Sequence, residues 1–595
     1  MEELPVELNV LTLNCWGLKY ISSYREERMT AIGRYLATNG PAPHIVALQE
    51  CFTERDYRII RRETRFALPY GKFYHSGAFG SGLVILSRWP IEESSMVPFS
   101  LCGRPTAFFR GDWYVGKGVA FARIRFGEGE KDIVEVFNTH THPSYSDERC
   151  YIVHQLSEAW EIAKLVRGAA ERGHFAIALG DFNCVPYSLP YRLLTAHAPI
   201  RDAWRVLNPE SSLGSTYDEL ERARGAPMPT AAFNVAENGV TNNSVYNTWA
   251  WSRSKRRALR MGKRPMLVPP ETPDERGHRI DYVFFSRGGD PHALPTDLSE
   301  ILSARNTYTD DGAGNIPAPP GWVVKDANVG LMARHPELGC SLSDHFSVEA
   351  TLVLHTPMPL PRRHRQRSES PSPTRGMDLP MSPIKSSTTT QSQDRGTTLR
   401  DLQAQQKQRE PQRERPETPR SFTSTEAGLQ TIGARAAALE QGAYLQSPAA
   451  SSYRRNSRDQ ALWDQQLTSL DASAPPRLPL AFYDEIAQLI QEDIHTAQRY
   501  RGLRIMHFFV WPVVLIGSYI GIWFLPNGKG AFGLLVASSL GFAFGVVDLF
   551  LALLFHASEI RKLCEFEWEI LNAKAVASGM SPDGLAHQAS GEEKW

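Results

Sequence analysis

Two long apolar runs in the last fifth of this 595-residue chain constrain its architecture more than any other feature. Residues 505–525 form the first run, residues 531–555 form the second, and only the turn-forming sequence PNGKG separates them. At 1.5 Å per residue, a helix over 505–525 is about 31 Å long, which matches a hydrocarbon core about 30 Å thick. We therefore predict two transmembrane helices. A hydrophobic hairpin buried within a soluble protein is the alternative.

Basic residues flank the predicted hairpin on both sides. Arg499, Arg501 and Arg504 precede the first run, and Arg561 and Lys562 follow the second. Two spans return the chain to its starting side, and the positive-inside rule makes that side cytosolic. We expect a multi-pass membrane protein whose N-terminal domain and C-terminus are cytosolic. The endoplasmic reticulum and the mitochondrial outer membrane are both open as the location.

Asp548 is the single acidic residue within the two runs. Counted from the turn, it lies almost level with His507 on the other arm of the hairpin, so His507 is a candidate partner. The alternative is that Asp548 reaches the membrane surface without a partner.

Residues 1–355 have the pattern of a folded domain. Short β-rich runs alternate there with helical segments, which is typical of the α/β class. Predicted strands cover residues 8–14, 44–50, 81–88, 118–126, 133–140, 175–183, 279–286 and 346–354, and predicted helices cover 22–38 and 147–172.

The chain between this domain and the hairpin changes character. Residues 356–428 contain ten prolines and one aromatic residue, which predicts a disordered Pro/Ser/Gln-rich linker. Residues 429–504 are predicted to be a helical juxtamembrane region. Its last part, 482–504, fits either a helix packed on the domain or an interfacial helix leading to the bilayer. Residues 556–595 are expected to form a cytosolic tail.

Charge and cysteine content narrow the function classes. The 65 basic and 65 acidic residues balance, which argues against an obligate polyanion binder. The seven cysteines are odd in number and widely spaced, without a CxxC pair. The N-terminus has no long apolar run that would predict a signal peptide. These features indicate reduced thiols in the cytosol and neither a disulfide framework nor a zinc knuckle.

Polar side chains recur where the predicted strands end. Because strand ends converge on one edge of a sheet, such a series predicts one shared site. Carboxylate and amide oxygens suit Mg²⁺, or alternatively Mn²⁺, and not zinc. The series comprises Asn14, Glu50, His140, His142, Asp181, Asn183, Asp281, Asp344 and His345.

The ordered motifs LNCWG, QE, NTH, GDFN, RIDYV and SDH resemble the endonuclease/exonuclease/phosphatase superfamily. The resemblance covers roughly residues 1–355. It implies a deoxyribonuclease-like four-layer α/β/β/α sandwich that cleaves phosphoesters with a divalent metal. The disordered linker and the transmembrane hairpin would follow this sandwich.

Within that superfamily, the element NTHTH and the C-terminal hairpin are similar to neutral sphingomyelinases. The layout is closest to fungal inositol phosphosphingolipid phospholipase C. The WxGDxN and WCDR motifs of inositol-polyphosphate 5-phosphatases are missing, since the chain reads ALGDFN and HRIDYV. The resemblance implies hydrolysis of sphingolipid phosphodiesters to ceramide. A membrane-tethered nuclease or phosphatase of the same superfamily is the alternative, and a non-enzymatic scaffold is a third.

The resemblance also implies roles for the residues at the strand ends. His345 would be the general base, oriented by Asp281, and Asp344 would be a further acid. Glu50 would hold Mg²⁺ with help from Asn14. Asp181 and Asn183 would position water or transition-state oxygens, and His140 would donate a hydrogen bond to the developing charge.

The segment GDWYVGKG (111–118) is close to a nucleotide P-loop. Gly118 stands where a P-loop needs Ser or Thr, and a strand is predicted to follow, so an NTPase is rejected. Neutral sphingomyelinases carry a similar segment, and the resemblance makes Asp112 and Lys117 a P-loop-like activation switch that responds to lipid. The alternative is a surface turn with an incidental ion pair.

A basic cluster at 253–264 carries seven of the chain's positive charges. A solvated loop, a dock for anionic membrane and a site for an inositol-phosphate head group are the open interpretations. The expected partners are a sphingolipid substrate and activating anionic phospholipids, without nucleic acid. The head group, the number of metal ions and the oligomeric state stay open.

Overall fold

The computed structural model describes residues 7–38, 40–129, 132–144, 151–262, 267–288, 321–355, 465–466 and 478–579. The predicted linker at 356–428 and most of 429–479 lie outside these ranges. The domain boundaries proposed for those segments therefore stay predictions.

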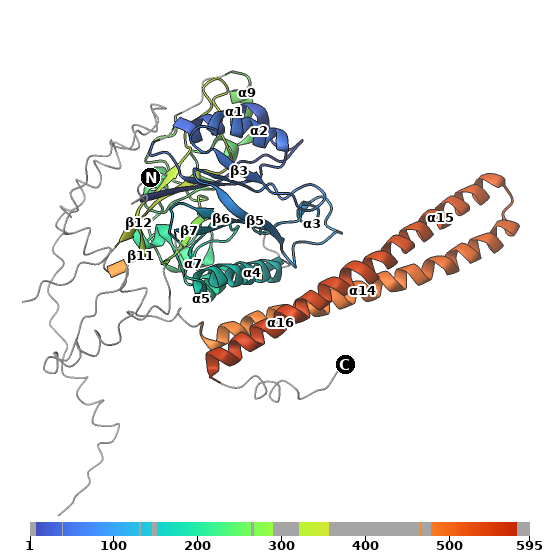
Figure 1. Cartoon of the computed structure of the whole chain (residues 1–595). Coiled ribbons are helices and arrows are strands. Elements are labelled where there is room, and N and C mark those ends of the chain that lie inside the picture. The colour runs from blue at the N-terminus through green and yellow to red at the C-terminus, as the bar shows by residue number, and fades with distance from the viewer. Residues whose placement is uncertain are drawn as a thin grey trace, which may run out of the picture. The chain divides into compact units, whose positions relative to one another are not determined.

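Two six-stranded mixed sheets form the centre of the N-terminal domain (Figure 1). The first sheet has the order β11-β12-β1-β2-β4-β3, and its strands are β1 Glu7–Asn14, β2 Ile45–Gln49, β3 Tyr70–Phe73, β4 Val84–Ser87, β11 Gly321–Gly330 and β12 Ser347–His355. The second sheet has the order β5-β6-β7-β8-β10-β9, and its strands are β5 Ile91–Pro98, β6 Gly118–Arg125, β7 Ile133–His140, β8 Phe175–Asp181, β9 Ile200–Asp202 and β10 Asp281–Ser286.

Helices cover the outer face of each sheet. An apolar cluster between the sheets draws on the inward residues of β1, β7, β8 and β12, and two further clusters join the outer faces to the helices. Helices α1 Arg25–Thr38 and α2 Glu54–Thr64 cover the first sheet, and α4 Ile152–Glu171 and α5 Leu189–His197 cover the second. The order helix, sheet, sheet, helix confirms the predicted four-layer sandwich.

Short helices occupy the connections. These are α3 Asp112–Val115, α6 Ala203–Leu207, α7 Glu219–Ala223, α8 Ala231–Ala236, η2 Thr248–Ala250 and α9 Arg253–Arg260. The basic cluster at 253–264 thus begins with α9, which Ser252 caps by accepting from the backbone N–H of Lys255. Its alternative interpretation as a loop is wrong for 253–260, and residues 263–264 lie outside the described ranges.

Each of the eight predicted strands overlaps an observed strand, whereas β3, β5, β9 and β11 were not predicted. Strand β5 reads IEESSMVP and lies at a sheet edge with a largely exposed face, so it lacks the apolar alternation that marks a buried strand. Helix α2 also escaped prediction, because its sequence ERDYRIIRRET buries only a narrow face.

The C-terminal part of the chain is a pair of long helices joined by a tight turn (Figure 1). Its elements are α14 Leu480–Gly521, η4 Ile522–Phe524, α15 Gly528–Phe550, η5 Leu551–His556 and α16 Ala557–Ser578. Two helical stretches, Leu480–Phe524 and Gly528–Ser578, are long and apolar enough to cross a membrane. Only 6% and 17% of their apolar windows are buried, unlike the core helix of a soluble domain, which is mostly buried.

Asp548 has two partners on the facing helix. The His507 Nδ1 atom lies 2.8 Å from Asp548 Oδ2, which confirms the pairing predicted from the hairpin count. Arg504, one helical turn before His507, also pairs with Asp548. The sequence did not predict Arg504 as a partner, because it was assigned to the basic flank.

The halves of the helices nearest the domain pack against it. Ile486, Ile490 and Ile494 of α14 share an apolar cluster with Leu156 and Trp160 of α4. Helix α16, where a tail was expected, adds residues such as Phe566 to this cluster. Segment 482–504 was expected either to pack on the domain or to lead to the bilayer. It belongs to one continuous helix that packs on the domain and then enters the apolar run, so both interpretations apply.

A substitution at Gly180 in β8 tests the tight pairing of β7 with β8. Its φ is +145°, and a Cβ there would lie 2.0 Å from the carbonyl oxygen of Thr139. We expect Gly180→Ala to destabilise the domain by about 3 kcal/mol and to lower the thermal unfolding midpoint of the detergent-purified chain. Gly168→Ala is the control, because that helical position has room for a methyl group and should gain roughly 0.5–1 kcal/mol. Equal midpoints for the two variants would contradict the observed strand pairing.

Candidate active site

Strand alternation places four of the predicted site residues on the inner faces of the sheets. In β1, Leu8 and Val10 contribute to the core between the sheets, and Asn14 continues that face. The same period of two applies to His140 in β7, Asp181 in β8 and Asp281 in β10. The side chains that follow the core residues along these strands therefore meet at one end of the sandwich.

Pairing register brings three of them into a single row across the second sheet. His140 pairs with Asp181 in the parallel β7–β8 ladder, and Asp281 pairs with Asp181 in the antiparallel β10–β8 ladder. His140 Nε2 lies 3.6 Å from Asp181 Oδ2. All three side chains are buried.

Asn14 connects this row to the first sheet. Its Nδ2 donates to Glu50 Oε1 and to Asp181 Oδ2, at 3.0 Å in each case. Gly17 permits the close approach, since a Cβ there would lie 2.1 Å from the carbonyl oxygen of Glu50. The glycine of LNCWG thus lets Glu50 come up against the end of β1, next to Asn14.

His345 and Asp281 form a hydrogen-bonded pair. His345 Nδ1 lies 2.9 Å from Asp281 Oδ2, and the other ring nitrogen, Nε2, lies 3.9 Å from Asp181 Oδ2. A proton on Nδ1 therefore faces Asp281 and leaves Nε2 directed toward the carboxylate row. This is the orientation that a general base needs.

Two residues that sequence reasoning missed complete this pair. Thr241 Oγ1 donates to Asp281 Oδ2 at 2.6 Å, and Asn242 Nδ2 lies 2.7 Å from His345 Nε2. Both belong to the loop sequence VTNNS, which follows no predicted strand. A run of four side chains able to form hydrogen bonds was the only available signal, and such runs are common in loops.

Burial and mutual repulsion control the charges at this edge. Burial, followed by the charge of Asp344, raises the pKa of Glu50 to about 7. Burial and then the charge of Asp281 raise the pKa of Asp181 to about 6. Burial opposes protonation of His345, but the charge of Asp281 and its hydrogen bond outweigh it and raise the His345 pKa well above the usual value.

A hard divalent cation fits this donor set. Glu50, Asp181 and Asp344 bring three carboxyl groups to one edge, Asp181 buried and the other two partly buried, and loss of solvent raises the pKa of each. Asp181, Asp281 and His345 also bring one ligand atom each within 4.8 Å of one another. The structure therefore provides a candidate metal centre at the edge where the sequence predicted one.

A second group at metal-ligand distance, His154, Asp493 and Glu559, does not fit a cation. Arg104 already forms ion pairs with both carboxylates. The backbone N–H of Gly103 donates to His154 Nδ1 at 3.0 Å, so the neutral ring carries its proton on Nε2, the atom that faces the carboxylates. This group is a charge cluster between the domain and the long helices.

The side chains of two predicted residues lie beside the carboxylate row without hydrogen bonding to it. Asn183 donates from Nδ2 to the carbonyl oxygen of Thr141 at 3.0 Å, and its backbone N–H donates to Asp181 Oδ1. Asp344 is held by Ser343, whose Oγ lies 3.4 Å from Asp344 Oδ1. Asn183 therefore orients Asp181 through the backbone.

Asp112 and Lys117 form a buried ion pair next to this edge. Lys117 Nζ lies 3.4 Å from Asp112 Oδ1 and donates to the carbonyl oxygen of Thr141 at 2.8 Å. The same carbonyl accepts from Asn183, so the P-loop-like segment and the GDFN motif share one backbone oxygen. The strand predicted after Lys117 is present as β6.

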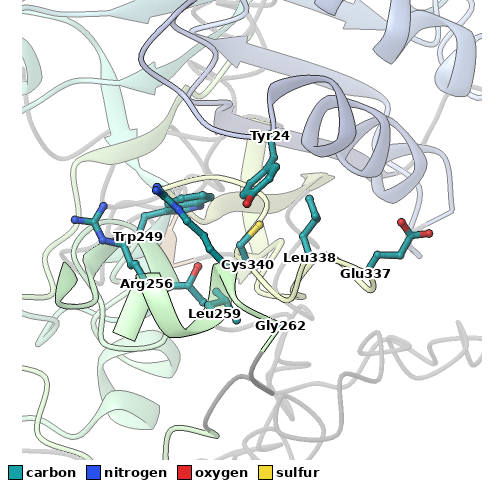
Figure 2. Close-up of a pocket in the computed structure, with 10 residues that line it drawn as sticks. Tyr24, Trp249, Arg256, Leu259, Gly262, Glu337, Leu338 and Cys340 are labelled. Atoms are coloured by element: carbon teal, nitrogen blue, oxygen red, sulfur yellow. The ribbon is translucent and has the colours of Figure 1, made fainter. Parts of the chain in front are cut away.

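A cavity of about 130 Å³ lies near the site but outside the carboxylate row (Figure 2). Tyr24, Trp249, Arg256 and Cys340 are among the residues that line it, as Figure 2 shows. None of the strand-end residues lines the cavity. Trp249 is its link to the site, because the Trp249 ring lies 4.5 Å from the ring of Trp16 in the LNCWG motif.

Comparison with known proteins assigns the family. The profile described as "Endonuclease/Exonuclease/phosphatase family" matches residues 11–345, which contain every strand-end residue of the site. The chain belongs to this family.

Curated relatives fall within the branch that the motifs indicated. The chain is 37% identical over 353 residues to an inositol phosphosphingolipids phospholipase C of Schizosaccharomyces pombe, covering 59% of this chain and 69% of that protein. It is 30% identical to the protein of the same name from Saccharomyces cerevisiae, covering 58% and 64%. It is 30% identical to sphingomyelin phosphodiesterase 2 of Rattus norvegicus, covering 33% and 46%. The alignment thus spans less than two thirds of the last two proteins.

Thr241 provides a test of the His345–Asp281 arrangement. Thr241→Val keeps the shape of the side chain and removes the donor to Asp281, so we expect phosphodiester hydrolysis to fall about tenfold. Thr216→Val is the control, since that hydroxyl bonds a backbone carbonyl near the surface. Turnover is measured at saturating substrate, with the unfolding midpoint as the folding check. Full activity of the Thr241 variant would exclude a role for this hydrogen bond.

Proposed function

We propose that this protein is a membrane-anchored, Mg²⁺-dependent phospholipase C that hydrolyses sphingolipid phosphodiesters to ceramide and a phosphorylated head group. The observation that carries this proposal is the His345–Asp281 pair facing a buried carboxylate edge, in a domain packed on two membrane-type helices. The family assignment and the named relatives support it.

His345 is the proposed general base. In its neutral form it takes a proton from water at Nε2 while Asp281 holds Nδ1–H, and Asn242 must release Nε2 for this step. The water oxygen bonds to phosphorus, and the bond from phosphorus to the ceramide oxygen breaks. The ceramide oxygen leaves with the bonding pair and gains a proton, and His345 returns its proton to solvent.

Glu50 is the proposed metal ligand, with Asn14 holding it in place, and Asp181 and Asp344 would add negative charge around the cation. Mg²⁺, or Mn²⁺ in its place, would polarise the phosphoryl oxygen when bound. His140 would donate a hydrogen bond to the charge that develops on the phosphoryl oxygens. Asn183 would keep Asp181 directed toward the substrate.

The membrane arrangement and the activation switch are part of the same proposal. We place residues 505–525 and 531–555 in the bilayer and the catalytic domain in the cytosol, because the basic residues cluster on that side. Anionic phospholipids would activate the enzyme by changing the Asp112–Lys117 pair, which contacts the catalytic edge through Thr141. The higher identity and longer alignment favour inositol phosphosphingolipids over sphingomyelin as substrate.

A substrate panel tests the reaction. The purified full chain with Mg²⁺ and anionic phospholipid receives phosphoinositol ceramide, phosphocholine ceramide, abasic duplex DNA and inositol polyphosphates. We expect ceramide release from a ceramide phosphodiester, and a loss of at least about a thousandfold in His345→Ala, because the variant lacks the base. Cleavage of DNA or of inositol polyphosphates without ceramide release would replace this function with a nuclease or phosphatase.

Metal binding gives a second test that does not depend on turnover. At about a hundred times its dissociation constant, Mg²⁺ should stabilise the chain by about 2.7 kcal/mol. Glu50→Gln should remove most of this gain, and the exposed Glu54→Gln should keep it. Protons compete with the cation for Glu50, whose pKa is about 7 without metal, so the affinity should rise from pH 6 to pH 8. Equal thermal shifts in both variants would reject Glu50 as a ligand.

A further inference from the structure

We propose that an aromatic loop beside the active site inserts into the surface of the same bilayer that the hairpin crosses. The loop, residues 104–115, carries Phe108, Phe109, Trp113 and Tyr114, and Phe79 joins it. We call loop 104–115, together with the Phe79 ring that packs on it, the aromatic loop. The inference rests on the proposed membrane enzyme and goes beyond it, since it names the surface by which the catalytic edge meets lipid.

The loop exposes rings that a soluble surface would normally bury. The Phe109 side chain is fully exposed and that of Phe108 is 56% exposed. Their rings lie 5.8 Å apart, and Phe108 and Phe79 lie 5.2 and 5.6 Å from Tyr114. The rings therefore form one continuous apolar patch, and such patches mark interaction sites.

Contact with η5 fixes the level of this patch relative to the membrane. The Trp113 ring lies 5.1 Å from the ring of Phe555. Phe555 is the last residue of the second apolar run, and Glu559, Arg561 and Lys562 follow within seven positions. The aromatic loop thus lies where the chain passes from hydrocarbon to water, which is the zone that aromatic side chains prefer.

The backbone of the loop is tied down at several points. The backbone carbonyl oxygen of Tyr114 accepts hydrogen bonds from the backbone N–H groups of Ala78 and Phe79. The Tyr114 hydroxyl donates to the carbonyl oxygen of Pro105. Arg104 pairs with Asp493 of α14 at 2.7 Å and with Glu559 of α16 at 2.5 Å. The loop is therefore attached to both long helices. The exposure of its rings is thus a feature of a loop that is held in place by hydrogen bonds and ion pairs.

The loop is also joined to the catalytic edge. Helix α3, which contains Asp112, lies within it, and Lys117 follows after Gly116. Lys117 pairs with Asp112 and donates to the backbone oxygen that follows His140. Insertion of the rings would hold this edge against the lipid head groups. A lipid surface is the favoured occupant, because the patch continues from an apolar span of its own chain.

Photo-crosslinking tests the insertion without any turnover. The full chain, with Phe109 replaced by p-benzoylphenylalanine, is reconstituted into phosphatidylcholine–phosphatidylserine vesicles that contain no sphingolipid. We expect lipid adducts in the mass spectrum of the irradiated protein. The same replacement at Phe66 is the control, since that ring is 85% exposed and follows α2. Equal adduct yields at the two positions, or adducts between two protein copies at position 109, would overturn the proposal.

Hydrolysis measurements separate this inference from the proposed function. Phe108→Ser with Phe109→Ser should reduce ceramide release from vesicle-borne substrate about tenfold and leave release from detergent micelles unchanged, because micelles present single lipid molecules. Phe66→Ser should match the natural chain in both assays. Equal loss in vesicles and micelles would assign the rings to the fold or the chemistry instead. If the natural chain releases no ceramide at all, the proposed function fails, and the crosslinking result still decides the insertion.

Discussion

The amide of Asn14 holds together two carboxylates that would otherwise repel each other. Glu50 comes from the first sheet and Asp181 from the second, and one Nδ2 group donates to both. The pKa values of both acids are raised, largely by burial, so keeping both ionised costs free energy without a cation. The rest of the site is arranged around this junction, since His140 and His345 both face Asp181.

Below the junction, a second amide contact joins the sheets. Gln49 Nε2 donates to Asn138 Oδ1 at 2.7 Å, and Asn138 donates to the backbone oxygens of Leu48 and Val84. Both side chains are buried, so their polar groups are costly unless they are paired. Satisfied pairs of this kind favour one relative position of the sheets. The distance between Glu50 and Asp181 depends on this relative position of the sheets. A metal site requires that distance to be well defined.

The sequence predicted the site residues better than it predicted their connections. Asn14 and Asp181 were predicted to share a site because each lies at the end of a predicted strand, and His345 because it directly precedes one; the structure brings the three side chains together. Thr241 and Asn242 were not found, because their importance comes from the antiparallel β10–β8 pairing and from a loop that reaches His345 across a hundred residues. Local patterns mark strand ends, whereas the register between distant strands is decided by packing in three dimensions. The same reason explains why Arg504 was missed beside Asp548.

The continuity of α14 connects the anchor to the chemistry. One helix runs from Leu480 to Gly521, and Ile486, Ile490 and Ile494 near its start are buried against the domain. A flexible tether would only raise the local concentration of enzyme near lipid. In the proposed membrane arrangement, a helix that also holds Arg104 and the aromatic loop would set the height and tilt of the catalytic edge over the lipid surface. A phosphodiester at the bilayer surface lies at a nearly constant depth, so a fixed height removes orientational freedom that would otherwise oppose catalysis.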